Sequence, residues 1–78
     1  MMLLLATTAM NAQPALKRAN KQYELGTFSL AAQSYKDFLN KNPDNAEANG
    51  KLGDCYRRLN QQEQALPHYQ AAIASADV

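Results

Sequence analysis

From Pro14 onward, apolar residues recur at steps of three and four, in four blocks separated by turn-forming residues. This spacing places the apolar side chains on one face of a helix, and no segment shows the sustained two-residue alternation expected of a strand. The first block holds Leu16, Ala19 and Tyr23, and it ends at Gly26, a residue that adopts a left-handed conformation at low cost. The pattern therefore predicts an all-α fold.

The second block predicts a helix that Thr27 caps at its start. This helix is expected to end before Pro43, because the residue ahead of a proline avoids helical geometry. Its predicted inward residues are Phe28, Ala31, Ala32, Tyr35, Phe38 and Leu39.

Two further helices are predicted beyond Pro43. Asp44 or Asn45 is expected to cap the third, and the fourth is expected to begin near Glu63, with Pro67 just beyond its first turn. The third helix has the apolar stripe Ala48, Leu52, Cys55, Tyr56 and Leu59. The predicted inward residues of the fourth are Ala65, Leu66, Tyr69, Ala72 and Ile73.

The pattern repeats after 34 residues. The residues Ala19, Gly26, Ala31 and Tyr35 return as Gly53, Asn60, Ala65 and Tyr69. A fixed period of this length indicates helix–turn–helix units that bury their apolar faces against one another. We therefore expect two antiparallel helix–turn–helix repeats forming a short α-solenoid, the first hairpin spanning 14–43 and the second 44–78.

Residues 1–13 differ from the rest because they carry no charge. An apolar run followed by small residues is typical of a secretory signal, although no basic residue precedes the run here. We expect a truncated signal peptide, with a disordered leader as the alternative. The segment is too short to span a bilayer, which takes about 20 apolar residues.

The composition of the chain argues against several classes of function. The chain has 78 residues and a formal net charge of +1, so long-range attraction to nucleic acid is not expected. One cysteine and one histidine, Cys55 and His68, cannot form a structural zinc site, which uses about four ligands. We predict no catalytic residues, no cofactor and no metal, and hence no enzyme. Because a core of this size is marginal, we expect a piece of a longer protein.

The second unit resembles the tetratricopeptide repeat, through Leu52-Gly53-x-x-Tyr56 followed by Ala65, Tyr69 and Ala72. The first unit shares Gly26-x-Phe28, Ala31, Tyr35 and Pro43, but has Arg18-Ala19 where Leu-Gly is usual. The large aromatic residue early in the family's first helix is absent, because Ala15 and Asn49 hold those places. The resemblance implies a module that binds a protein or peptide partner through its concave face.

A narrower resemblance rests on the run from Lys51 to Asn60 after a leader ending in Asn11-Ala12-Gln13. It is similar to the amino-terminal repeats of OmpA-like envelope proteins of Bacteroidetes-type bacteria, which typically continue into domains that this chain does not contain. It implies a periplasmic or outer-membrane-associated protein after export; without export the chain would be cytoplasmic.

The family resemblance places the first helix of each unit along the concave groove. The predicted partner-binding residues are Lys17, Asn20, Glu24, Lys51, Asp54, Arg57 and Arg58. For each of these residues the alternative is an ordinary solvated helix face with intrahelical charge pairs. For the module, the alternative is a structural spacer or a self-association element that forms homo-oligomers through its exposed end helices.

Overall fold

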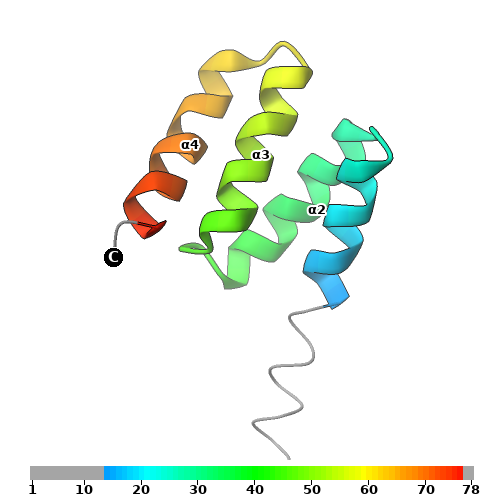
Figure 1. Cartoon of the computed structure of the whole chain (residues 1–78), viewed down its shortest axis with the longest axis horizontal. Helices are drawn as coiled ribbons and strands as arrows, with labels where there is room; N and C mark the ends of the chain where they lie inside the picture. Colours follow the sequence, from blue (N-terminus) through cyan, green and yellow to red (C-terminus); the bar gives the residue numbers. More distant parts are fainter. Residues whose placement is uncertain (1–13, 77–78) are drawn as a thin grey trace, which may run out of the picture.

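The structure, a computed structural model, describes residues 14–76. It contains a helix over residues 14–24 (the first helix), α2 (Phe28–Lys41), α3 (Ala46–Arg58) and α4 (Gln62–Ala76). Successive helices run in opposite directions and lie side by side in chain order (Figure 1). The predicted all-α fold of two antiparallel hairpins is confirmed. The predicted leader, 1–13, and the last two residues of the second hairpin lie outside the described residues.

The turn within each hairpin contains a left-handed residue. Gly26 has φ 80° and Asn60, at the matching place in the second unit, has φ 63°. Asparagine tolerates this conformation better than most other residues that have a Cβ. The predicted equivalence of these two turns is confirmed, and it keeps the two hairpins in the same register.

Of the two predicted cap residues, Asn45 caps its helix through its side chain and Thr27 does not. The side chain of Asn45 accepts a hydrogen bond from the backbone N–H of Ala48 at 2.8 Å, as a cap should. Thr27 stands at the start of α2, but its side chain makes no cap hydrogen bond. Its hydroxyl instead donates to the carbonyl of Gln22 at 2.9 Å, which closes the end of the first helix. Thr27 is therefore the N-cap residue of α2, as predicted, but its side chain does not make the expected cap hydrogen bond.

The core joins the first helix, α2 and α3. Its fully or almost fully buried members are Ala19, Ala31, Ala32, Tyr35, Phe38, Ala48, Leu52 and Cys55. Four of these residues are alanines, whose small side chains allow helix axes to approach to the 8–10 Å typical of packed helices. The predicted buried, structural position of Cys55 is confirmed.

α4 covers α3 with only part of its predicted inward face. Ala65 is buried, while Tyr69 and Ala72 are half-buried. Leu66 and Ile73 are 57% and 69% exposed, so their prediction as inward residues is wrong. α4 is the end of the described stack, so no described helix covers its outer side (Figure 1).

Two glycines of α3 provide a matched test of helix contact. A Cβ added to Gly53 would lie 3.0 Å from ring carbons of Tyr69 and 3.2 Å from the carbonyl oxygen of Ala65, whereas one added to Gly50 would meet Ala72 at 3.8 Å. We expect Gly50→Ala to stabilise the fold by up to about 1 kcal/mol, through helix propensity. Gly53→Ala gains the same propensity but overpacks the contact, so its unfolding free energy should be about 1–3 kcal/mol lower than that of Gly50→Ala. Urea unfolding followed by circular dichroism measures both; equal effects would contradict a tight α3–α4 contact at Gly53.

Candidate functional site

Asp54, in the middle of α3, accepts hydrogen bonds from two arginines on the same helix. Arg57 donates from Nε and Nη2 to Oδ1, at 3.2 and 2.5 Å, and Arg58 donates from Nε to Oδ2 at 3.2 Å. Positions three and four residues apart lie on one face of a helix, so this pairing follows from local geometry. The Asp54 side chain is only 16% exposed, while those of Arg57 and Arg58 are 52% and 48% exposed.

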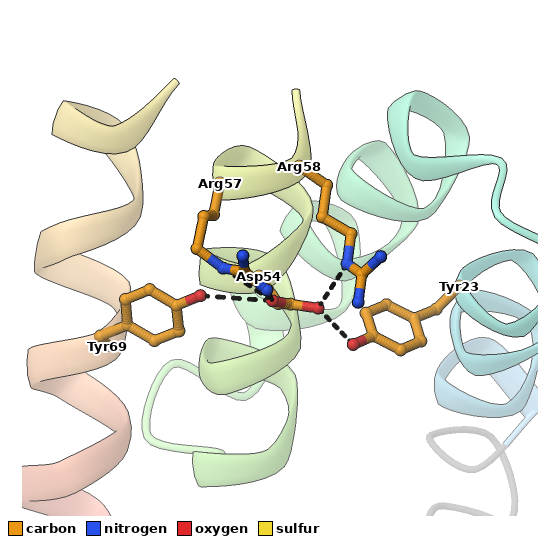
Figure 2. Close-up of polar contacts among 5 residues, drawn as sticks. All are labelled: Tyr23, Asp54, Arg57, Arg58 and Tyr69. Carbon is orange, nitrogen blue, oxygen red and sulfur yellow. Dashed lines mark hydrogen bonds and ion pairs between the residues drawn. The ribbon is translucent and has the colours of Figure 1, made fainter. Parts of the chain in front are cut away.

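Two tyrosines from neighbouring helices reach the same carboxylate. The hydroxyl of Tyr23 in the first helix donates to Oδ2, and that of Tyr69 in α4 donates to Oδ1 at 3.5 Å. They approach Asp54 from opposite sides (Figure 2). Asp54 therefore links three helices through hydrogen bonds. We call Tyr23, Asp54, Arg57, Arg58 and Tyr69 the Asp54 cluster.

The charge state of Asp54 follows from these contacts. Burial raises the pKa of its carboxyl, but hydrogen bonds from Tyr23, Arg57 and Arg58 outweigh burial, so the pKa lies below its ordinary value. The hydrogen bond to Asp54 and then burial raise the pKa of the Tyr23 hydroxyl. At neutral pH the cluster therefore holds an ionised carboxylate between two guanidinium groups.

A second group of polar side chains lies beside this cluster. The amide nitrogen of Asn20 donates to Glu47 Oε2 at 3.0 Å, and its amide oxygen accepts from the hydroxyl of Tyr35 and from Lys51 Nζ, the latter at 3.5 Å. Lys51 also pairs with Glu47 at 3.7 Å, and its Nζ lies 5.3 Å from the centroid of the Tyr23 ring. Tyr23 thus connects the two groups.

The structure brings most of the predicted groove residues together. The two groups contain Asn20, Lys51, Asp54, Arg57 and Arg58. Lys17 and Glu24 are exposed on the first helix and contribute no side-chain hydrogen bond or ion pair to either group in the described part of the chain. Their role in binding a partner stays a prediction, as it does for the other five.

Four members of these groups were not predicted as site residues by the sequence analysis: Tyr23, Tyr35, Glu47 and Tyr69. Glu47 lies four residues before Lys51 on one helix, so the pair could have been found from spacing alone. The tyrosines were assigned to the apolar face, where a hydroxyl needs a polar partner. That need was readable in the sequence, but the partner was not, because Tyr23 and Asp54 are 31 residues apart.

An open apolar hollow lies next to Arg58. It is lined by Gly26, Thr27, Phe28, Ser29, Leu30 and Leu59. The guanidinium carbon of Arg58 lies 5.1 Å from the centroid of the Phe28 ring, so this member of the Asp54 cluster also borders the hollow. Leu30 is 59% exposed. This part of the surface therefore offers charged and apolar contacts side by side.

The remaining candidates for chemistry have structural contacts. Burial, with a contribution from Asp54, raises the pKa of the Cys55 thiol to about 11. The Asn49 amide donates to the carbonyls of Pro43 and Asn45, so its oxygen is left to accept a hydrogen bond from His68 Nδ1 at 3.1 Å.

Within 14–76, no three histidine, cysteine or acidic side chains gather as a metal site would require. No helix in this range has both the length and the apolar character that a membrane crossing needs.

Replacing the central carboxylate tests its structural role. Asp54→Asn removes a charged acceptor, so we expect the free energy of unfolding at pH 7 to fall by about 1–3 kcal/mol. Because folding lowers the pKa of Asp54, the stabilisation is complete above the unfolded pKa of about 3.9 and is lost as the pH falls through the folded value. The difference in the free energy of unfolding between wild type and Asp54→Asn should therefore be smaller at pH 3 than at pH 7.

Urea titrations at pH 7 and pH 3 measure this difference. Asp37→Asn is a suitable control, because Asp37 is exposed on α2 and accepts a single side-chain hydrogen bond, from Gln33, which an asparagine can also accept. It should change stability little at pH 7. A difference for Asp54→Asn that is as large at pH 3 as at pH 7 would contradict the assignment.

Comparison with known proteins agrees with the repeat geometry. The tetratricopeptide repeat family model matches residues 16–77, which is most of the chain. No curated protein and no solved structure matches the chain significantly. Two antiparallel hairpins in register, with small residues at the helix contacts, have the architecture that this match implies. The chain belongs to the tetratricopeptide repeat family.

Proposed function

We propose that the chain binds a peptide or protein partner along the face formed by the first helix and α3. Tetratricopeptide repeats generally mediate protein–protein interaction and are typically non-catalytic. The observation that carries the proposal for this face is the Asp54 cluster, in which a mostly buried carboxylate orients two half-exposed guanidinium groups.

Orientation before binding favours affinity. Each guanidinium has five N–H donors, and Asp54 accepts from two of Arg57 and one of Arg58, so several donors on each arginine stay free for a partner's carboxylate or carbonyl oxygens. Ordering a long side chain on binding costs about 0.5–1.5 kcal/mol, and Asp54 already restricts both arginines.

The surroundings offer two further kinds of contact. Lys51 and Asn20 extend the polar surface along α3 and the first helix. The hollow beside Phe28 supplies an apolar contact next to Arg58. A partner segment with an acidic residue close to an apolar one would match this surface. Interfaces commonly combine an apolar anchor with such oriented polar groups.

We also propose that the chain acts after export, in the periplasm or at the outer membrane. Support comes from the uncharged, apolar-then-small composition of residues 1–13 and from the resemblance to envelope proteins. The wild-type chain expressed in a Gram-negative host should be recovered from the periplasm with a mass that shows cleavage between Ala9 and Gln13. Leu4→Arg, which interrupts the apolar run, should prevent this. Full-length wild-type chain confined to the cytoplasm would refute export.

The face is tested with peptides selected by phage display on the immobilised wild-type chain. We expect Arg57→Gln with Arg58→Gln to raise the Kd of a selected peptide at least about 10- to 100-fold, because the loss of even one charge-assisted hydrogen bond costs about 1.5–3 kcal/mol. Fluorescence anisotropy of the labelled peptide measures the Kd. Circular dichroism checks that helicity is retained.

The control for this test makes the same charge change elsewhere. Lys36→Gln with Lys41→Gln alters two exposed lysines on α2 and should leave the Kd within about twofold of wild type, as is usual for charges outside an interface. If both pairs of substitutions change the Kd equally, or if selection yields no binding peptide, the proposed face is wrong.

A further inference from the structure

The two arginines of the Asp54 cluster are held in different ways. Arg57 donates from Nε and Nη2 to one oxygen of Asp54, at 3.2 and 2.5 Å, so one of its two Nη groups is already engaged. Arg58 donates only from Nε, at 3.2 Å, to the other oxygen. In the described part of the chain no side-chain hydrogen bond engages the Nη groups of Arg58. Its four Nη N–H donors therefore remain for a partner.

Arg58 also lies against an aromatic ring. Its guanidinium carbon is 5.1 Å from the centroid of the Phe28 ring, which is within the range of a cation–π contact. The hydrogen bond from Nε and the contact with the ring together restrict both the direction and the plane of this guanidinium. A planar guanidinium fixed in this way suits a carboxylate, because its two Nη groups can donate parallel hydrogen bonds to the two oxygens.

Tyr23 contacts both groups that hold Arg58. Its hydroxyl donates to Oδ2 of Asp54, the oxygen that also accepts from Arg58 (Figure 2). Its ring meets the Phe28 ring edge to face, with the centroids 5.7 Å apart and the planes at 79°. Tyr69, in contrast, approaches the opposite oxygen, at 3.5 Å. A change at Tyr23 is therefore transmitted to Arg58 by two routes.

We propose that Arg58 is the specificity-determining residue of the partner-binding face, that it binds the carboxylate of an acidic side chain in the partner, and that Tyr23 positions it. This inference rests on the function proposed above. The apolar hollow lies next to Arg58, so the acidic residue that Arg58 binds is the one adjacent to the partner's apolar residue. Arg57 contributes positive charge without the same geometric selectivity.

The first experiment separates geometry from charge. Arg58→Lys keeps the positive charge but removes the planar pair of donors and the stacking on Phe28, so we expect the Kd of the selected peptide to rise about tenfold. Arg57→Lys should raise the Kd about threefold or less, because it keeps the charge that Arg57 contributes. Fluorescence anisotropy at one fixed salt concentration measures both variants.

The second experiment changes the peptide. Replacing its acidic residue by the corresponding amide should raise the Kd about tenfold or more for the wild-type chain, because a charge-assisted hydrogen-bond pair is lost. For Arg58→Lys the same replacement should have a clearly smaller effect, and for Arg57→Lys an effect as large as for wild type. This double-mutant cycle identifies the arginine that binds the carboxylate.

The third experiment tests the role of Tyr23. Tyr23→Phe keeps the ring and removes the hydroxyl, so we expect the Kd to rise about two- to tenfold, as when one long side chain must be ordered on binding. Tyr69→Phe should have a smaller effect, because its hydroxyl is 3.5 Å from the carboxylate, at the oxygen that Arg57 contacts. Tyr56→Phe is the control. Tyr56 lies outside the Asp54 cluster with its ring against His68, and the Kd should stay within about twofold of wild type.

A measurement without peptide distinguishes positioning from general stability. The heteronuclear NOE of the Arg58 Nε–H group reports how rigidly this side chain is held on the ps–ns timescale. In Tyr23→Phe the NOE of Arg58 should fall, while that of Arg57 and those of the α3 backbone amides should stay at their wild-type values. A purely structural role of Tyr23 would instead change the backbone amides or leave both arginines unaffected.

Three results would overturn the inference: equal effects of Arg58→Lys and Arg57→Lys on the Kd, selected peptides that contain no acidic residue, or an Arg58 NOE that does not respond to Tyr23→Phe. Each of these leaves the partner-binding face intact if Arg57→Gln with Arg58→Gln still raises the Kd. If that double substitution has no effect, the face itself is wrong and the role of Arg58 falls with it.

Discussion

The close approach of α3 and α4 at Gly53 is the contact on which the packing of the second hairpin depends. Because Gly53 has no side chain, the ring of Tyr69 lies against the backbone of α3. The Tyr69 hydroxyl then reaches Asp54, the next residue along α3, while Tyr23 reaches the same carboxylate from the first helix. The helix contact at Gly53 therefore also brings Tyr69 to the Asp54 cluster.

The Asp54 cluster shows how a repeat fold can hold charge on a surface without leaving it mobile. An exposed pair of arginines would lose side-chain freedom whenever a partner bound, and that loss would weaken binding. Asp54 removes much of the freedom in advance, and it is itself held by tyrosines from the helices on either side. The proposed binding face thus depends on contacts between helices, so its geometry and the stability of the stack are coupled.

The stack is also directional. In a solenoid each unit contacts only its neighbours, so the two ends must be finished by other means. Here the first helix carries charged residues, Arg18 and Lys21, at positions that are apolar and buried in α3, whereas α4 leaves Leu66 and Ile73 exposed at positions that are covered in α2.

The sequence alone predicted the helical periodicity, the repeat of 34 residues and the left-handed turn residues Gly26 and Asn60. These features depend on neighbouring residues within one helix or turn. The pairing of Asp54 with Arg57 and Arg58 was predictable for the same reason. Three features could not be predicted from the sequence. These are the hydrogen bond from Tyr23 to Asp54, the exposure of Leu66 and Ile73, and the hydrogen bond of the Thr27 hydroxyl to the end of the first helix. The periodicity that marks a helix face as apolar does not say which other helix, if any, covers it. Only the packed structure decides that, because distant segments meet through the angles and distances between helices.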